Sequence, residues 1–304
     1  MKLTYTVPEK YDNTAVKVFL RGHCCLSYRL MVSLKHVENG IMNNGVHTRV
    51  IDKVRTGDVI TLDLPDKPPK AEAMSDLYMP GIIYEDEHIT VIDKPAHMPV
   101  HTSKGHYSDT LANAVAAYDL SLGRQRAFRP VYRLDADTSG VVVLANHAHA
   151  AARLAGRVEK QYYAVVEGEI DPPAGTIDLP LGKCEGYGIK RLVDENGENA
   201  VTHYHTLLSS AGRSLLSIRL ETGRTHQIRA HFAHLGHPVT GDWMYGLEAG
   251  FDRFLLHCGF AWLEHPATGE MMCFRSKLPD LFFETLYGEG SAHCCISGES
   301  NKTV

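Results

Sequence analysis

The stretch Val131-Tyr132-Arg133-Leu134-Asp135-Ala136-Asp137-Thr138-Ser139-Gly140 holds two carboxylates separated by one residue, between an arginine and a Thr-Ser-Gly turn. The apolar run at 141–145 follows directly and is typical of a buried strand. Carboxylates at the entrance to such a strand need hydrogen bonds or a charged partner, because burying them unpaired is costly. Asp135 and Asp137 are therefore either structural caps or catalytic groups.

The composition is that of an ordinary globular protein. The chain has 304 residues, of which 44% are hydrophobic and 22% are charged. This length allows two domains, or one large domain with an appendage. No apolar run approaches the ~20 residues that a membrane-spanning helix needs, and residues 1–8 lack the apolar core of a signal peptide. We therefore expect a cytoplasmic protein that does not associate with membranes.

Cysteine and histidine patterns argue against a metal site. The seven cysteines include two adjacent pairs and no Cys-x-x-Cys, which favours reduced thiols over disulfides or structural zinc. Of His226, His231, His234 and His237, the last three are spaced at i, i+3 and i+6, which spreads them around a helix instead of along one face. We predict no metal, and no nucleotide cofactor either, because Gly-x-x-x-x-Gly-Lys-Ser/Thr is absent.

The net charge of −5 argues against a protein that coats nucleic acid without specificity. A local basic cleft remains compatible with this charge, because recognition depends on where the charges lie.

Turn signals and changes of pattern divide the chain into a first unit at 1–66, a linker at 67–78, a large domain at 79–288 and a tail at 289–304 that we expect to be disordered. The first unit has helix patterns at 14–21 and 26–36, turns on both sides of Ile41-Met42, and a strand pattern ending at 62. This order resembles the S4-type RNA-binding module. A small αβ packing domain is the alternative interpretation.

The large domain alternates strand and helix patterns. We expect strands at 82–84, 89–93, 141–145, 162–167, 201–208 and 214–221. We expect helices at 109–120, with Ser108 as the N-cap, at 148–158 and at 225–235. Several strands with a few helices favour an α+β fold around one large sheet.

Several segments of the large domain resemble the signatures of the RluA family of RNA pseudouridine synthases. The first is Arg133-Leu134-Asp135-x-x-Thr138-Ser139-Gly140. The others lie at 92–101, 159–168 and 220–242, and Leu255-Leu256-His257 with His265-Pro266 matches the end. Each segment alone is weak, but together they follow the family's order and spacing. An S4-like module ahead of such a domain is the family's usual architecture.

This resemblance implies the pseudouridine synthase fold, a large mixed and mainly antiparallel sheet with flanking helices and a central active-site cleft. It also implies isomerisation of specific uridines to pseudouridine in structured RNA, either ribosomal or transfer RNA, by a monomeric enzyme without a cofactor. The reaction breaks an N-glycosidic bond and rejoins the base through carbon, for which one ionised carboxylate suffices. The target uridine has to leave the helical stack first.

The family's site residues carry over to matching positions. The resemblance makes Asp135 the nucleophile, Arg229 its charge partner and Tyr162 the aromatic wall against the uracil. It is silent on whether Asp135 attacks C1′, attacks C6 or deprotonates the sugar. The residues that it implies for substrate binding are Arg133, Leu256, Lys94, Thr138, His226 and Arg224.

Asp137 is better explained as a turn-forming residue, because short polar side chains commonly accept local backbone N–H groups. Two positions depart from the family pattern. Tyr132 stands where many relatives carry His, and His97 stands where the Lys-Pro segment usually has Gly.

Two other functions compete. Asp135-Ala136-Asp137-Thr138 fits the Asp-x-Asp-x-Thr of haloacid-dehalogenase-like phosphatases, but that family puts the motif after an apolar strand, and here the apolar run follows it. The acidic pair needed for Mg²⁺ is also missing, since the segment 241–244 has one carboxylate. The second alternative is a non-catalytic RNA-binding protein. The net negative charge supports it, while intact Asp135, Tyr162 and Arg229 argue against it.

Overall fold

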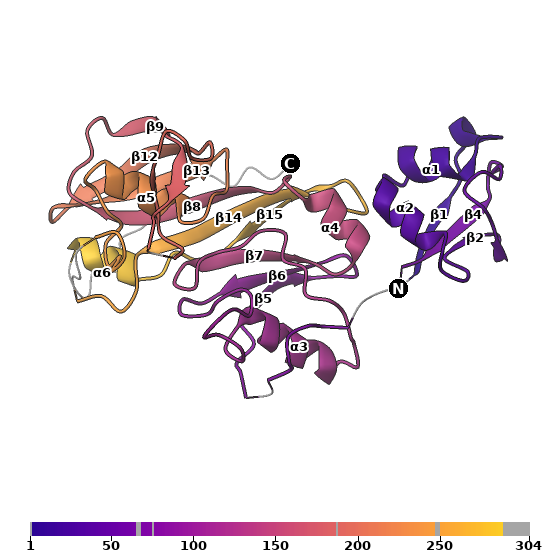
Figure 1. The fold of residues 1–304 in the computed structure, drawn as a ribbon, viewed down its shortest axis with the longest axis horizontal. Helices are drawn as coiled ribbons and strands as arrows, with labels where there is room; N and C mark the ends of the chain where they lie inside the picture. Colours follow the sequence, from indigo (N-terminus) through magenta and orange to yellow (C-terminus); the bar gives the residue numbers. More distant parts are fainter. Residues whose placement is uncertain (1, 65–67, 75, 187, 247–249, 288–304) are drawn as a thin grey trace.

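The structure is a computed structural model that describes residues 2–64, 68–74, 76–186, 188–246 and 250–287 (Figure 1). The expected disordered tail at 289–304 lies outside these residues. The chain has two main hydrophobic cores. One is built only from residues between 3 and 64, and the other from residues between 89 and 274. Within the described residues, no helix has the length and apolar character needed to cross a bilayer.

The N-terminal core is covered by a four-stranded antiparallel sheet in the order β1-β4-β2-β3. Both expected helices form, with shorter bounds, and the short strand at 41–43 turns back through Asn44 and Gly45, which both have positive φ. The elements are β1 Lys2–Thr6, the 3-10 helix η1 Glu9–Tyr11, α1 Val16–Gly22, α2 Tyr28–Leu34, β2 Ile41–Asn43, β3 Val46–His47 and β4 Val59–Asp63.

The larger sheet has nine strands in the order β5-β6-β7-β14-β8-β13-β12-β9, with β15 paired to β14. Only β7 and β14 run parallel among these pairs, so the expected mixed and mainly antiparallel sheet is confirmed. Its strands are β5 Ile82–Glu85, β6 Ile89–Lys94, β7 Ser139–Ala145, β8 Glu159–Glu167, β9 Ala174–Asp178, β12 Val201–Ser210, β13 Arg213–Leu220, β14 Leu256–Glu264 and β15 Met271–Arg275. A separate hairpin pairs β10 Leu181–Lys183 with β11 Arg191–Val193.

Four helices accompany this sheet: α3 Leu111–Ser121, α4 Ala148–Leu154, α5 Gln227–His234 and α6 Leu281–Tyr287 (Figure 1). The predicted N-cap Ser108 is wrong. Thr110 caps α3 instead, because its side chain and that of Asn113 form a reciprocal capping box. The helix predicted at 148–158 ends at Leu154, and α6 was not predicted.

Helices α5 and α6 pack on opposite faces of the sheet. Ile228 of α5 shares a core with Ala164 of β8, whereas Phe282 of α6 shares a core with the next residue, Val165. Successive residues of a strand point to opposite faces, so β8 separates the two cores.

The strand that follows the Thr-Ser-Gly turn, β7, is buried along its whole length, as the apolar run predicted. Gly140 has a φ of +110°, and a Cβ there would lie 2.1 Å from the carbonyl oxygen of Cys258 on the parallel neighbour β14. Glycine is therefore required for β7 and β14 to approach closely at the point where the Asp135 loop ends.

We predict that Gly140→Ala lowers the free energy of unfolding by more than the roughly 1–3 kcal/mol of backbone strain alone, because the new methyl group also displaces β14. The matched control is Gly212→Ala, which has a φ of +71° but no atom within 4 Å of an added Cβ. Urea unfolding of both variants measures the difference. Equal losses would contradict the packing argument.

Candidate active site

Asp135 lies in the loop that precedes β7, and a buried lysine supports this loop from below. Lys94, the last residue of β6, is fully buried. Its ammonium group donates to the carbonyl oxygens of Pro95 at 2.7 Å, Met98 at 2.8 Å and Ala136 at 2.8 Å. The residue after Asp135 is thus tied to the end of β6.

These three hydrogen bonds use all three hydrogens of the Lys94 ammonium group. Burial lowers the pKa of Lys94 to about 7, with the charge of Arg253 acting in the same direction and Asp137 and Asp135 opposing it. The three carbonyl acceptors favour the charged form. Lys94 has no hydrogen left for an RNA, which counts against the substrate-binding role that the resemblance implies.

A second buried cation stands above the loop. Arg229, on α5, donates from Nη1 to Asp135 Oδ2 at 3.1 Å. It also makes a bidentate pair with Asp242, from Nε to Oδ2 at 2.6 Å and from Nη2 to Oδ1 at 2.9 Å. The Asp242 side chain is fully buried, and the backbone N–H groups of Met244 and Tyr245 donate to its Oδ1.

The two carboxylates differ in exposure, and this difference separates their roles. The Asp242 side chain is 0% exposed and that of Asp135 is 28% exposed. Burial alone would lower the pKa of Arg229, but the hydrogen bonds and charge of Asp242, together with Asp135, hold this pKa above its ordinary value. Arg229 therefore stays cationic, fixed by Asp242 and aimed at an Asp135 carboxylate that solvent can reach.

Asp135 opens onto a pocket of ≈ 60 Å³. Tyr162 of β8 and Leu256 of β14 form its apolar walls, and both are buried. Burial raises the pKa of Tyr162 well above its ordinary value, and electrostatic interactions with Cys258 and Asp135 raise it further. The phenol is therefore protonated at neutral pH and offers an O–H donor.

The pocket brings together eight of the nine site residues that the sequence suggested. Lys94 is the exception, because it lies beneath the loop. The lining residues are Arg133, Leu134, Asp135, Thr138, Tyr162, Leu220, Arg224, His226, Gln227, Ile228, Arg229 and Leu256.

His226 precedes α5 in the left-handed conformation, with a φ of +55°. Its Nε2 lies 3.8 Å from Asp135 Oδ2, and its Nδ1 lies 3.1 Å from the hydroxyl of Tyr245. Burial lowers the pKa of His226, against the opposing charge of Asp135. The ring therefore favours its neutral form and shapes the pocket beside Asp135.

Arg224 lies at the rim of the pocket. Its guanidinium pairs with Glu198 and donates to the carbonyl of Asn199 at 3.0 Å, and its backbone N–H donates to Gln227 Oε1 at 3.0 Å. The same Gln227 donates from Nε2 to the carbonyl of Val201 at 2.9 Å and so ties the loop to β12.

The sequence analysis missed the roles of Gln227, Tyr245 and Asp242. Gln227 and Asp242 lie within the segment 220–242 that resembles the family, and this location was the only indication in the sequence that they belong to the site. Tyr245 lies outside that segment. Nothing in the sequence pairs Asp242 with Arg229 or places Tyr245 beside that guanidinium, where the ring centre lies 5.1 Å away.

Asp137 lies outside the pocket lining. Its Oδ1 lies 3.1 Å from His97 Nδ1, and His97 Nε2 lies 3.4 Å from Asp252 Oδ2. This side-chain contact takes the place of the turn-capping bonds that the sequence favoured for Asp137. His97 has a φ of +59°, a region that favours glycine, which accounts for the Gly that the family usually has there.

Metal ligands do not gather in the described parts of the chain, where no group of three or more His, Cys, Asp or Glu side chains has a geometry suited to an ion.

Comparison with known proteins assigns this site to a family. A sequence model of the RNA pseudouridylate synthases matches residues 88–234. An uncharacterised RNA pseudouridine synthase of Bacillus subtilis is 34% identical, over 88% of this chain and 97% of its own. The ribosomal large subunit pseudouridine synthase D of Pseudomonas aeruginosa is 37% identical, over 79% of this chain and 80% of its own.

A solved structure agrees. Human RNA pseudouridylate synthase domain containing 1 superposes with a TM-score of 0.56 at 27% identity, covering 68% of this chain and 85% of its own. The chain belongs to the RNA pseudouridylate synthase family. It is an enzyme that isomerises uridine to pseudouridine in RNA, and the phosphatase and non-catalytic interpretations are set aside.

The position of Lys94 leads to a first test at this site. We expect Lys94→Met to lower kcat with little change in the Kd for RNA, because the lysine positions the Asp135 loop and does not contact substrate. It should also destabilise the fold, at about 1–3 kcal/mol for a buried polar group left without a partner. Single-turnover kinetics and filter binding separate the two effects. A large loss of RNA affinity with unchanged kcat would restore the substrate-binding role.

The buried pair leads to a second test. We expect Asp242→Asn to cost about 3–5 kcal/mol of stability, because it leaves Arg229 buried with half of its charge compensation removed. Asp135→Asn is the matched comparison. It breaks a single bond to the same arginine at a more exposed position, so its cost should be about 1–2 kcal/mol. Chemical denaturation measures both, and equal costs would contradict the anchoring role of Asp242.

Proposed function

We propose that Asp135 is the nucleophile of the isomerisation, that Arg229 is its charge partner and that Tyr162 is the wall against which the uracil lies. The observation that supports this best is the single solvent-accessible carboxylate in the pocket, whose Oδ2 is held 3.1 Å from a buried guanidinium. A nucleophilic carboxylate needs a fixed orientation and a charge partner, and the guanidinium of Arg229 provides both.

The charge balance of the reaction fits this arrangement. If Asp135 attacks C1′, the C1′–N1 bond breaks and its electron pair leaves with the uracil. The negative charge then moves from Asp135 to the base, within reach of the same Arg229. The base turns, and C5 bonds to C1′ as the C1′–O bond of the aspartyl ester breaks and regenerates the carboxylate. The proton on C5 is then released, and N1 takes up a proton. Attack at C6, or removal of a sugar proton, remains an alternative first step for the same carboxylate.

RNA has to present its uridine outside the stack, at a cost of roughly a few kcal/mol. We propose that Arg133 and Arg224 bind the backbone beside the flipped uridine, because Arg133 is exposed and both line the pocket. Thr138, His226 and Leu256 would contact the nucleotide. In place of the substrate contact that the resemblance implies, we propose that Lys94 positions the Asp135 loop.

We propose the division at 1–66 and 79–288, with 67–78 as the linker and the first unit as an S4-like RNA-binding domain. The separate core at 3–64 supports the division. RNA contact is supported by six basic residues of the first unit: Arg21, Arg29, Lys35, Arg49, Lys53 and Arg55. Two of these residues are already paired, Arg49 with Asp52 and Arg55 with Asp12. Arg21, Arg29, Lys35 and Lys53 are the remaining candidates.

The RNA substrate is proposed to be ribosomal or transfer RNA, and the protein a cytoplasmic monomer that works without a cofactor. The name of the similar ribosomal large subunit enzyme of Pseudomonas aeruginosa favours ribosomal RNA. Pseudouridine mapping in both RNA pools, from cells with and without this gene, identifies the target.

We predict that Asp135→Asn abolishes tritium release from RNA labelled at C5 of uridine, because C5 loses its hydrogen only when the new bond forms. RNA binding should persist, and raising salt should weaken it through counterion release. Asp137→Asn is the matched control, since it changes a neighbouring carboxylate outside the pocket, and it should retain most activity. Full activity of Asp135→Asn would overturn the assignment.

A further inference from the structure

The face of the large sheet opposite the catalytic pocket carries a second concave surface. Tyr162 of β8 faces the pocket, so its neighbours Gln161 and Glu159 alternate to the other face. On β14, Leu256 lies opposite Ala164 and Cys258 opposite Tyr162, but the register then shifts and Phe260 lies opposite Gln161. The extra residue is Gly259, a β-bulge that turns Phe260 and Trp262 away from the pocket.

Aromatic rings and guanidinium groups are stacked on this face. Phe260 and Trp262 have parallel rings, with centroids 5.4 Å apart and an interplanar angle of 11°. Arg219 of β13 lies 5.5 Å from the Trp262 ring centre, and Arg275 of β15 lies 5.7 Å from that of Phe260. We call these four residues the Arg–aromatic surface. Helix α6 packs on the same face around Val165 and Leu215, whereas Arg219 and Arg275 are exposed when only the described part of the chain is considered.

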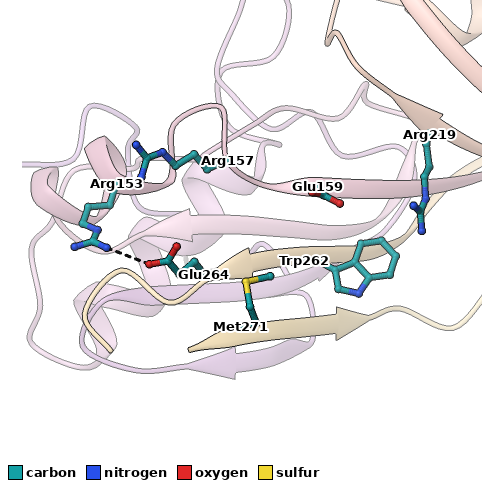
Figure 2. Close-up of a pocket in the computed structure, with 7 residues that line it drawn as sticks. All are labelled: Arg153, Arg157, Glu159, Arg219, Trp262, Glu264 and Met271. Carbon is teal, nitrogen blue, oxygen red and sulfur yellow. Dashed lines mark hydrogen bonds and ion pairs between the residues drawn. The ribbon is translucent and has the colours of Figure 1, made fainter. Parts of the chain in front are cut away.

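A hollow of ≈ 410 Å³ adjoins the Arg–aromatic surface (Figure 2). Trp262 and Arg219 lie at one end of it, and Arg153 and Arg157 lie at the other. Met271 is 68% exposed and lies between them in the view. The volume falls within the roughly 300–1,000 Å³ of ligand-binding clefts.

The charge of this region is opposite in sign to that of the whole chain. Arg153 pairs with Glu264 at 3.4 Å. Within the described ranges, Arg157, Arg219 and Arg275 have no carboxylate at ion-pair distance, although Glu159 also lines the hollow. Four arginines against two glutamates leave a local positive excess, on a protein whose net charge is −5.

We propose that the Arg–aromatic surface and its hollow bind a single-stranded segment of RNA. Bases without partners stack on aromatic rings and on guanidinium planes, and arginines hold the phosphates between them. A base would stack at Trp262 and Arg219, and the backbone would follow the hollow toward Arg157. The proposal rests on RNA being the substrate of the enzyme, but not on the roles assigned to Asp135, Arg229 or Tyr162.

Tryptophan fluorescence tests the proposal directly, because the chain has two tryptophans and Trp243→Phe leaves Trp262 as the only reporter. The probe is oligoadenylate about 12 nucleotides long, within the site sizes of about 4–16 nucleotides known for single-strand binding folds. It contains no uridine and so does not test the catalytic pocket. We expect saturable quenching of Trp262 that weakens as salt rises.

Variants locate the binding. In the Trp243→Phe background, Arg219→Gln and Arg157→Gln should each weaken oligoadenylate binding several-fold. Trp262→Leu, followed by anisotropy of a labelled probe, should weaken it about 5- to 150-fold, the range expected for losing one stacked base. Arg213→Gln is the matched control, since it removes the same charge from the other end of β13, where Arg213 pairs with Glu167. It should leave the affinity unchanged.

No quenching, or equal affinity for Trp262→Leu and the parent protein, overturns the proposal. The proposal is also overturned if the parent protein dimerises and Trp262→Leu is monomeric, because this face is then a contact between two copies of the chain. The catalytic assignment is judged separately by tritium release in Asp135→Asn, so failure of one inference does not imply failure of the other.

Discussion

The site depends on one guanidinium shared between two carboxylates. Arg229 is buried, and an isolated buried charge costs far more than the marginal stability of a domain allows. Asp242 removes that cost with a bidentate pair, and its own remaining lone pairs accept backbone N–H groups from the following turn. The remaining guanidinium nitrogen of Arg229, Nη1, donates to Asp135, whose side chain is accessible to solvent. The ion pair with Asp242 thus fixes the guanidinium that contacts Asp135.

The Asp135 loop is held by an equivalent arrangement on its other side. Lys94 is a buried lysine whose Nζ donates to three backbone carbonyls, one of them that of Ala136, next to Asp135. Gly140 lets the strand after the loop lie against β14, which supplies Leu256 to the pocket. Asp135 is therefore positioned by Lys94 through the carbonyl of Ala136, by Arg229 through its carboxylate, and by the packing of β7, which follows the loop.

Sequence reasoning identified the groups that meet in the pocket but not what holds them. Asp135, Arg229 and Tyr162 stand in short motifs, and motifs reveal residue types at fixed spacing. The partners of Lys94 are carbonyl oxygens, which every residue carries, so no pattern identifies them. Asp242 lies 13 residues from Arg229 across a turn, and its burial follows only from the fold. The predicted N-cap of α3, Ser108, was wrong for a related reason, because the reciprocal bonds between Thr110 and Asn113 that fix the cap are seen only in the fold.

The strand β14 shows the same limit on a larger scale. Alternation predicts one buried face per strand, and by parity Leu256, Cys258, Phe260 and Trp262 would all face the same side. One extra residue at Gly259 moves the last two to the opposite face, and a Cβ at Gly259 would lie 2.5 Å from the ring of Tyr163. The glycine therefore permits both the bulge and the packing of that ring. A single strand contributes Leu256 to the catalytic pocket and Trp262 to the surface behind it, because the bulge, rather than the alternation of the sequence, decides which way each side chain points.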